Sequence, residues 1–340
     1  MKKLQPTEYM YASARVRGLE NDLVGRERLE LLTECRSAEE VMDRLAEYGL
    51  TLPESDAPVT GENRGQLREL MLLAALQKAF DEAEAAVPDP AVFRYFRYPY
   101  DCNNLKAAIK CGIRGISAED MLFDFGAVPA SEVEALVREG KYEAFPEGMA
   151  AAAPRAREAY DKTGDPRAID SVLDAACFGD MMAAAQKTGD EILISWLAMR
   201  IDLVNILITL RVLRLGQGFV TGGLPEELLL PGGTLDTTFF EEAFAGGESR
   251  LWEALSPTDY YPLVKVEGDP RPLYAVEKAC DDLYMDRVRE DARIPFGAPV
   301  VGGYLVGWET AVKNIRIILA AKEAGWDPAT IRERIRVSYV

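Results

Sequence analysis

Apolar side chains recur every three to four residues along most of the chain, which is the spacing of one face of an α-helix. Val41 and Leu45, for example, lie four residues apart, with charged residues between them. Ser37 and Glu40 fit the first turn of this helix, as N-cap and third helical residue. Ser131 is predicted to start another helix in a similar way. Alternating, strand-like runs are almost absent, so the pattern predicts an all-α fold.

The most apolar stretch, residues 192–215, is long enough to cross a membrane. It carries five charged or polar residues: Arg200, Asp202, Asn205, Arg211 and Arg214. Each central charge would cost about 2.5–3.5 kcal/mol in a bilayer. The stretch is therefore predicted to be a helix in the core of the protein.

A short pattern occurs three times, at residues 101–109, 202–210 and 311–319. Each copy has an Asn, then Leu or Ile directly after it, then a further apolar residue four positions on, and each is followed by a Gly. The asparagines are Asn104, Asn205 and Asn314. Asp101 and Asp202 stand three residues before the first two asparagines, and Glu309 takes the place of the aspartate in the third copy.

The repeat predicts three related helical units of similar length, because self-similarity at a fixed period is the mark of repeated structure. The glycines Gly115 and Gly216 follow apolar-periodic stretches, where a helix is expected to end. Gly140 follows a third such stretch. The predicted units are residues 1–115, 116–215 and 216–340.

The shared Asn and Asp lie on one helix face, since residues three apart are neighbours on a helix. Apolar residues on the same face turn it toward a core, and a buried Asn must be hydrogen-bonded there. The Asp is expected either to orient the Asn or to tie the helix to a neighbouring loop. The alternative is that these polar residues contact a partner directly.

The amino-acid composition limits which catalytic groups, metal sites and partners the chain can have. The chain has no His, which excludes Ser-His and Cys-His catalytic arrangements and His-ligated zinc. Its cysteines form no CxxC pair and are predicted to be reduced core residues: Cys35, Cys102, Cys111, Cys177 and Cys280. The net charge of −17 disfavours nucleic acid and anionic lipid as partners, and it favours basic protein surfaces such as the cytoplasmic loops of membrane proteins.

Two motifs resemble ligand-binding sites, one for a dinucleotide and one for Mg²⁺ with diphosphate, but neither has the neighbouring sequence features that such a site needs. The glycine-rich residues 216–222 follow a helical pattern rather than a strand, so a dinucleotide site is not expected, and no GxxxxGK[ST] loop for ATP occurs. Asp281, Asp282 and Asp286 resemble the aspartate-rich face that holds Mg²⁺ and diphosphate in isoprenoid synthases. No second acidic motif pairs with them, so a solvated face is the simpler interpretation. No metal or cofactor is predicted.

Four motifs, in matching order over nearly the whole chain, resemble those of the C subunit of V/A-type rotary ATPases, the counterpart of the eukaryotic d subunit. The N-terminal motif contains Tyr9, Tyr11, Arg15 and Arg17. The central motif contains Asp101, Asn104 and Lys106, and the C-terminal helix motif contains Glu309, Asn314 and Arg316. Residues 331–335 match the closing segment.

The resemblance implies three similar helical subdomains in a pseudo-threefold, funnel-like arrangement. It implies a non-catalytic, peripheral component on the cytoplasmic face of the membrane, in a proton- or sodium-translocating complex. Its partners would be the D and F subunits of the central shaft and the membrane proteolipid (c/K) ring, with no direct nucleotide binding. Two other interpretations stay open: an all-helical Mg²⁺-diphosphate enzyme, and a generic helical-repeat adaptor.

Overall fold

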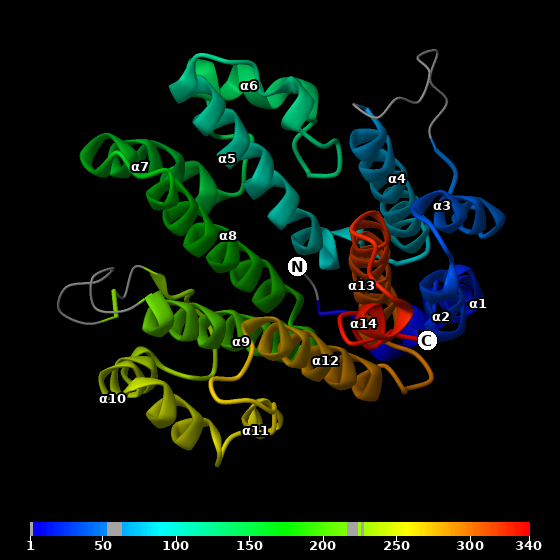
Figure 1. Cartoon of the computed structure of the whole chain (residues 1–340). Coiled ribbons are helices and arrows are strands. Elements are labelled where there is room, and N and C mark those ends of the chain that lie inside the picture. The colour runs from blue at the N-terminus through cyan, green and yellow to red at the C-terminus, as the bar shows by residue number, and fades with distance from the viewer. Residues whose placement is uncertain (1–2, 53–62, 216–223, 226–227) are drawn as a thin grey trace. The chain divides into compact units, whose positions relative to one another are not determined.

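The computed structural model describes residues 3–52, 63–215, 224–225 and 228–340. Within these ranges the chain forms α-helices and short 3-10 helices and contains no β-strand, which confirms the all-α prediction (Figure 1). The glycine-rich residues 216–222 lie outside the described part of the chain, and so does the predicted end of the second unit at Gly216.

Two compact units divide the chain. The middle unit comprises Pro90–Lys265 together with Met1–Lys3, and the terminal unit combines Leu4–Asp89 with Val266–Val340. The terminal unit is therefore assembled from both ends of the sequence. The predicted division into three related units concerns internal similarity rather than compactness, and it stays a prediction.

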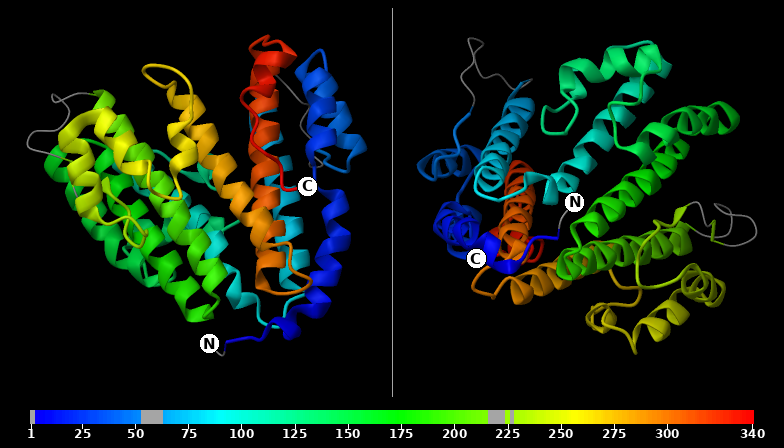
Figure 2. Two further views of the ribbon diagram at one scale, coloured as in Figure 1. Left: turned by 90° about the horizontal axis from the view of Figure 1, so that it is seen from below. Right: turned by 180° about the vertical axis from the view of Figure 1, so that it is seen from behind.

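Long helices build the middle unit. They are α5 (Tyr98–Arg114), α6 (Ala130–Glu139), α7 (Glu147–Thr163), α8 (Arg167–Thr188), α9 (Glu191–Leu215), α10 (Thr237–Leu255) and the short α11 (Tyr261–Val264). The 3-10 helices η3 (Pro90–Val92) and η4 (Arg94–Arg97) precede α5, and η5 (Glu119–Met121) lies between α5 and α6. Helix α8 packs against α5, α7 and α9, and α9 also packs against α10. Helix α8 lies between α7 and α9 in Figure 1, and Figure 2 shows these green helices from two further sides.

Helix α9 contains the apolar stretch that the sequence singled out. By length and composition it is the one helix in the described ranges that could cross a membrane, and 56% of its most apolar window is buried inside the protein. Trp196, Ile201 and Leu210 are fully enclosed, and Asp202 and Asn205 are buried beside them. This burial agrees with the prediction of a core helix.

The terminal unit is built around α13 (Ala298–Glu323). Its other elements are η1 (Pro6–Tyr9), α1 (Met10–Leu19), η2 (Glu20–Asp22), α2 (Arg26–Glu34), α3 (Ala38–Glu47), α4 (Arg64–Glu84), α12 (Leu273–Asp291) and α14 (Pro328–Arg332). Helix α13 packs against α1, α2, α3 and α4 from the first segment of this unit and against α12 and α14 from the second. It joins the two segments into one core.

Two glycines of α13 admit the C-terminal segment of the chain. A Cβ atom at Gly303 would lie 2.8 Å from the hydroxyl oxygen of Tyr339, and one at Gly307 would lie 2.9 Å from the Tyr339 Cβ. Such distances are too short for any larger residue. The absence of side chains at these two positions therefore lets Tyr339 lie directly on α13, where it is buried.

Helix ends follow the sequence signals in most cases. The Ser37 side chain accepts a hydrogen bond from the Glu40 N–H, and Gly115 and Gly140 end α5 and α6 in the left-handed conformation. The Ser131 prediction is wrong, because α6 already begins at Ala130. The Asp124 carboxylate accepts from the Ala130 N–H at 3.0 Å, so a loop side chain caps this helix instead.

All five cysteines are buried and none forms a disulfide, in line with their prediction as reduced core residues. In the described ranges, no cluster of acidic, Cys or His side chains has the arrangement of a metal site.

Candidate functional site

The asparagines of the first two repeat copies make the same pair of hydrogen bonds. In α5, the Asn104 Nδ2 donates to the Phe123 carbonyl at 2.8 Å, and the Phe123 N–H donates to Asn104 Oδ1 at 3.0 Å. In α9, Asn205 makes the same pair with Leu230, at 3.0 and 2.8 Å. Both asparagine side chains are buried. Each amide therefore satisfies the donor and the acceptor of one backbone residue in a loop that follows its helix.

The third asparagine repeats this geometry in the terminal unit. Asn314 of α13 is fully buried, its Nδ2 donates to the Arg336 carbonyl at 3.0 Å, and the Arg336 N–H donates to its Oδ1 at 2.7 Å. The bound residue here belongs to the segment that follows α14. All three copies thus use one amide side chain to hold one residue of a following segment.

Asp101 holds the same loop as Asn104. Its two carboxylate oxygens accept hydrogen bonds from the N–H groups of Ala127 and Val128, both at 3.0 Å. Asp101 is fully buried. Of the two roles that the sequence left open for the Asp, this geometry is the tie between helix and loop.

Asp202 holds the second loop in the same way and adds a further contact. Its carboxylate accepts from the N–H groups of Thr234 and Leu235, at 2.9 and 3.1 Å, and from the Thr234 hydroxyl. The hydroxyl of Tyr260 also donates to it, at 2.6 Å. Four donors therefore surround this buried carboxylate, which compensates for its removal from water.

Both loops meet their helix in one register. Ala127 lies four residues after Phe123, and Thr234 lies four residues after Leu230. The Asn therefore holds one loop residue, and the Asp, one turn earlier on the helix, holds the two residues that lie four and five positions further along the loop. We call each Asp–Asn pair with its loop a loop clamp; the first is Asp101 with Asn104, and the second is Asp202 with Asn205.

A glycine stands at the same place in both loop clamps. A Cβ atom at Gly126 would lie 2.0 Å from the Asp101 Oδ1, and one at Gly233 would lie 2.0 Å from the Asp202 Oδ1. No other residue fits so close to the carboxylate. Each glycine comes three residues after the loop residue that the Asn binds. These glycines were not predicted, although the spacing Phe123-x-x-Gly126 and Leu230-x-x-Gly233 repeats in the sequence.

The third copy holds its segment with different carboxylates. Asp282 of α12 accepts from the Val337 N–H at 2.7 Å, and Asp281 accepts from the side chains of Arg336 and Lys313 at 2.8 and 2.5 Å. Asp282 also pairs with Lys278. These carboxylates are thus engaged by cations and by backbone, so the aspartate-rich face serves the C-terminal segment.

Burial acts on the ionisable groups of the first two clamps. Removal from water raises the pKa of Asp101, against the opposing effects of the Val128 and Ala127 N–H groups and of Arg97. Burial and the hydrogen bond to Asp202 together raise the pKa of the Tyr260 hydroxyl far above its ordinary range. Tyr260 is therefore a permanent donor to Asp202 at physiological pH.

The remaining residues of the central and C-terminal motifs form ion pairs or lie partly exposed. Lys106 pairs with Asp174 of α8 at 2.5 Å. Arg316 pairs through two nitrogens with the Glu69 carboxylate of α4, one of them at 2.9 Å. Glu309 is half-buried on α13. Lys106 and Arg316 thus connect helices within their units and are not arranged around a shared ligand.

The N-terminal motif divides into an inward and an outward face. Tyr9 is buried, and Arg17 donates to the Ala292 carbonyl and to Glu20, the latter at 2.7 Å. Tyr11 and Arg15 are exposed on α1. Most of the predicted residues therefore bind loops or neighbouring helices of their own unit, while Tyr11 and Arg15 lie exposed on α1.

The chain matches the family of ATP synthase (C/AC39) subunits over residues 12–334. It is 25% identical to the C subunit of the A-type ATP synthase of Methanocaldococcus jannaschii, over 95% of this chain and 85% of that protein. It is 21% identical to the C subunit of the V-type sodium ATPase of Enterococcus hirae, over 98% and 99%. The C subunit of the Thermococcus kodakarensis A-type ATP synthase is 23% identical, over 96% and 90%.

The family match covers nearly the whole chain, includes all three copies of the repeat, and agrees with the all-helical fold. The chain belongs to the ATP synthase (C/AC39) subunit family.

Proposed function

We propose that this chain is a non-catalytic subunit of a proton- or sodium-translocating rotary ATPase. In this proposal it couples the central shaft, formed by the D and F subunits, to the membrane proteolipid (c/K) ring. The observation that carries the proposal is the family match over residues 12–334. The similar proteins are named as C subunits of A-type ATP synthases and of a V-type sodium ATPase.

The loop clamps support a mechanical role. A part that transmits torque must not yield, and loops are ordinarily the most yielding parts of a helical protein. Here residues 123–128 after α5 and residues 230–235 after α9 are each fixed to the preceding helix by buried Asp and Asn side chains. Asn314 and Asp282 fix the C-terminal segment in the terminal unit. Each unit is therefore suited to carry a load as a stiff body.

The charge supports a docking role. The net charge of −17 gives the protein an acidic surface, and the cytoplasmic loops of membrane proteins are rich in Lys and Arg. Complementary charge of this kind speeds association and fixes its orientation. We place the protein on the cytoplasmic face of the membrane as a peripheral component, docked on the loops of the ring. Three related subdomains in a funnel-like arrangement would leave a hollow for the tip of the shaft.

Reconstitution tests the proposal directly. Membranes that contain the ring are combined with the ATP-hydrolysing head and shaft, with and without this chain, and ATP hydrolysis and ion uptake are measured together. We expect the head to hydrolyse ATP in both samples and ions to be transported only when the chain is present. Adding the purified chain back should restore transport.

Two results would contradict the proposal. Ion transport at full rate without the chain would show that it is not the coupling part, and an adaptor role would then be favoured. Loss of ATP hydrolysis by the soluble head without the chain would indicate a part in catalysis instead.

Docking on the ring should also weaken as salt rises, since exposed charges are screened beyond about 8 Å at physiological ionic strength.

A further inference from the structure

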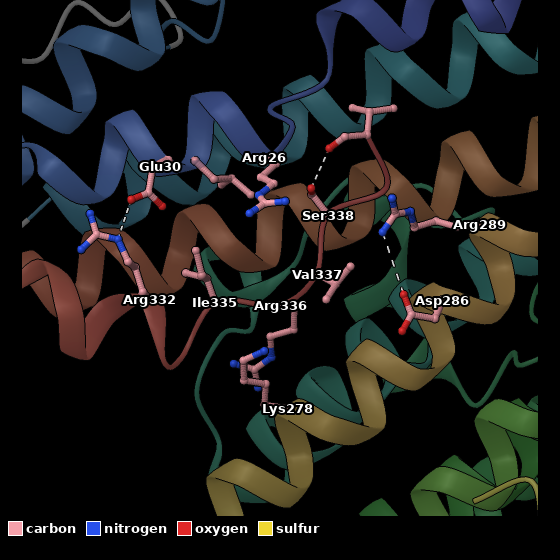
Figure 3. A pocket seen from close by; sticks show the side chains of 12 residues that line it. Arg26, Glu30, Lys278, Asp286, Arg289, Arg332, Ile335, Arg336, Val337 and Ser338 are labelled. Atoms are coloured by element: carbon pink, nitrogen blue, oxygen red, sulfur yellow. Dashed lines mark hydrogen bonds and ion pairs between the residues drawn. The ribbon is translucent and has the colours of Figure 1, made fainter. Parts of the chain in front are cut away.

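A cavity of about 430 Å³ lies within the terminal unit, between the start of α2, one face of α12 and the segment after α14 (Figure 3). Its lining is unusual for a protein with a net charge of −17. Cationic side chains outnumber acidic ones, and the cations are Arg26, Lys278, Arg289, Arg332 and Arg336. The acidic lining residues are Glu30 and Asp286.

Most of these cations are held in place by carboxylates. Arg332 pairs with Glu30 at 2.5 Å, and Arg336 pairs with Asp281 at 2.8 Å. Lys278 pairs with Asp282. Lys278 and Arg336 line the cavity, whereas their acidic partners Asp281 and Asp282 do not.

Two arginines retain donors for a ligand. Arg289 lies 3.9 Å from Asp286, which is longer than a hydrogen bond. Arg26 is exposed, and its side chain pairs with no acidic group in the described part of the chain. Figure 3 shows Arg26 and Arg289 on different elements bordering the cavity, one from α2 and one from α12. A guanidinium group binds carboxylates through paired N–H donors, so both are suited to an acidic ligand.

Apolar side chains complete the lining. Leu29, Ile335 and Val337 lie beside the cations. A fully hydrated inorganic anion would gain nothing from these aliphatic groups, whereas a peptide that carries both acidic and aliphatic side chains would contact both kinds of surface. The cavity volume admits a few side chains.

We propose that this cavity binds an acidic segment of another protein of the complex, with carboxylates on Arg26 and Arg289 and aliphatic groups on Leu29 and Ile335. The inference rests on the proposed function for the existence of that partner. The cavity would bind a partner of the opposite kind to the basic surfaces that the net charge favours, because the rest of this acidic protein would repel an acidic segment.

The test uses the full chain and a fluorescent hexapeptide of alternating Glu and Leu, with binding followed by anisotropy. The variant Arg26→Gln with Arg289→Gln should bind the peptide at least about tenfold more weakly, the effect of losing one charge-assisted hydrogen bond. The control variant Arg36→Gln with Arg114→Gln removes the same charge from exposed positions outside the cavity, and it should bind as the parent does. Thermal melts verify that both variants fold.

Equal weakening in both variants would overturn the proposal, because it would reflect net charge alone. So would undiminished binding when Ser replaces each Leu of the peptide, or displacement by inorganic pyrophosphate at the same concentration as by the peptide. The reconstitution experiment is repeated with the Arg26→Gln, Arg289→Gln variant in place of the parent chain, and ion uptake is measured. If the parent chain supports ion transport but does not bind the peptide, only the cavity proposal is rejected, whereas ion transport without any chain rejects only the coupling function.

Discussion

The hydroxyl of Tyr260 donates a hydrogen bond to the Asp202 carboxylate at 2.6 Å, across 58 residues of sequence. Both groups are buried, and Tyr260 stands directly before α11. The bond therefore ties the end of the middle unit to its core helix α9. It also joins the backbone donors of Thr234 and Leu235 on one carboxylate, so the second loop clamp spans three parts of the chain.

Replacing Tyr260 by Phe tests how much this hydrogen bond contributes to stability. We expect Tyr260→Phe to lower the free energy of unfolding by about 1–3 kcal/mol, because a buried carboxylate loses one of its donors. The measurement is a urea melt followed by circular dichroism. The matched control is Tyr261→Phe, since Tyr261 is the neighbouring tyrosine and is 45% exposed. Equal effects of the two substitutions would contradict the expectation.

Replacing the repeated asparagines tests whether they act as clamps or as partner contacts. Each of Asn104→Leu, Asn205→Leu and Asn314→Leu leaves a backbone N–H and C=O without their partner, and each should cost about 1–3 kcal/mol in urea melts. Asn103→Leu is the control, because Asn103 is exposed one position away on α5. If the three melts match that of the parent while binding of the shaft is lost, these residues are interface residues instead.

The clamp glycines give a sharper test. Gly126→Ala and Gly233→Ala would place a methyl group 2.0 Å from a carboxylate oxygen, so either the loop or the Asp must move. We expect each to destabilise by about 1–3 kcal/mol, the usual cost of overpacking. Gly112→Ala in α5 is the control, because its Cβ would meet no atom within 4 Å, and it should stabilise the helix by about 0.5–1 kcal/mol.

A double-mutant cycle assigns the cost of Gly126→Ala to its cause. In a chain that already carries Asp101→Ala, the clash partner is absent, so Gly126→Ala should cost much less than in the parent. Independent, additive effects of the two substitutions would show that the glycine serves some other purpose than making room for Asp101.

Two buried tyrosines of the terminal unit predict a loss of stability in alkali. Burial raises the pKa of Tyr304 to about 12 and the pKa of Tyr339 to about 12, from an ordinary value of 10.0. As pH rises above about 10, the unfolded chain releases these protons first, so the free energy of unfolding falls until about pH 12. Each tyrosine contributes about 2–3 kcal/mol to this loss.

Urea melts at a series of pH values measure the slope, and phenolate absorbance measures the titration itself. Tyr339→Phe should flatten the fall by the share of that residue, at the cost of the hydroxyl contact with Arg17. A fall with the same slope in Tyr339→Phe would show that this residue does not cause it.

The repeated Asp and Asn were visible in the sequence because they occupy fixed places on a helix, where spacing dictates which residues share a face. Their partners were not, since Phe123 follows Asn104 by 19 residues and Leu230 follows Asn205 by 25. The path of a loop over that distance depends on the packing of other helices. The two possible roles of the Asp likewise could not be distinguished without the position of the loop.

The cation-lined cavity was still harder to predict from the sequence than the loop partners. Arg26 is separated from Lys278 and Arg336 by most of the sequence, and no local pattern connects the three. They share a site because the two segments of the terminal unit pack together, through α13 and through direct contact of α2 with α14. The sequence did predict the helix ends at Gly115 and Gly140, because those signals are carried by the residues that adopt the conformation.

The discontinuous terminal unit sets an order of events during synthesis on the ribosome. The middle unit is almost one unbroken stretch, so its helices can find their partners soon after they emerge. Helices α1 to α4 emerge first, yet their main partner α13 begins only at Ala298. Their apolar faces must wait, uncovered, until α13 has been translated, and in this interval the nascent chain exposes apolar surface that favours aggregation.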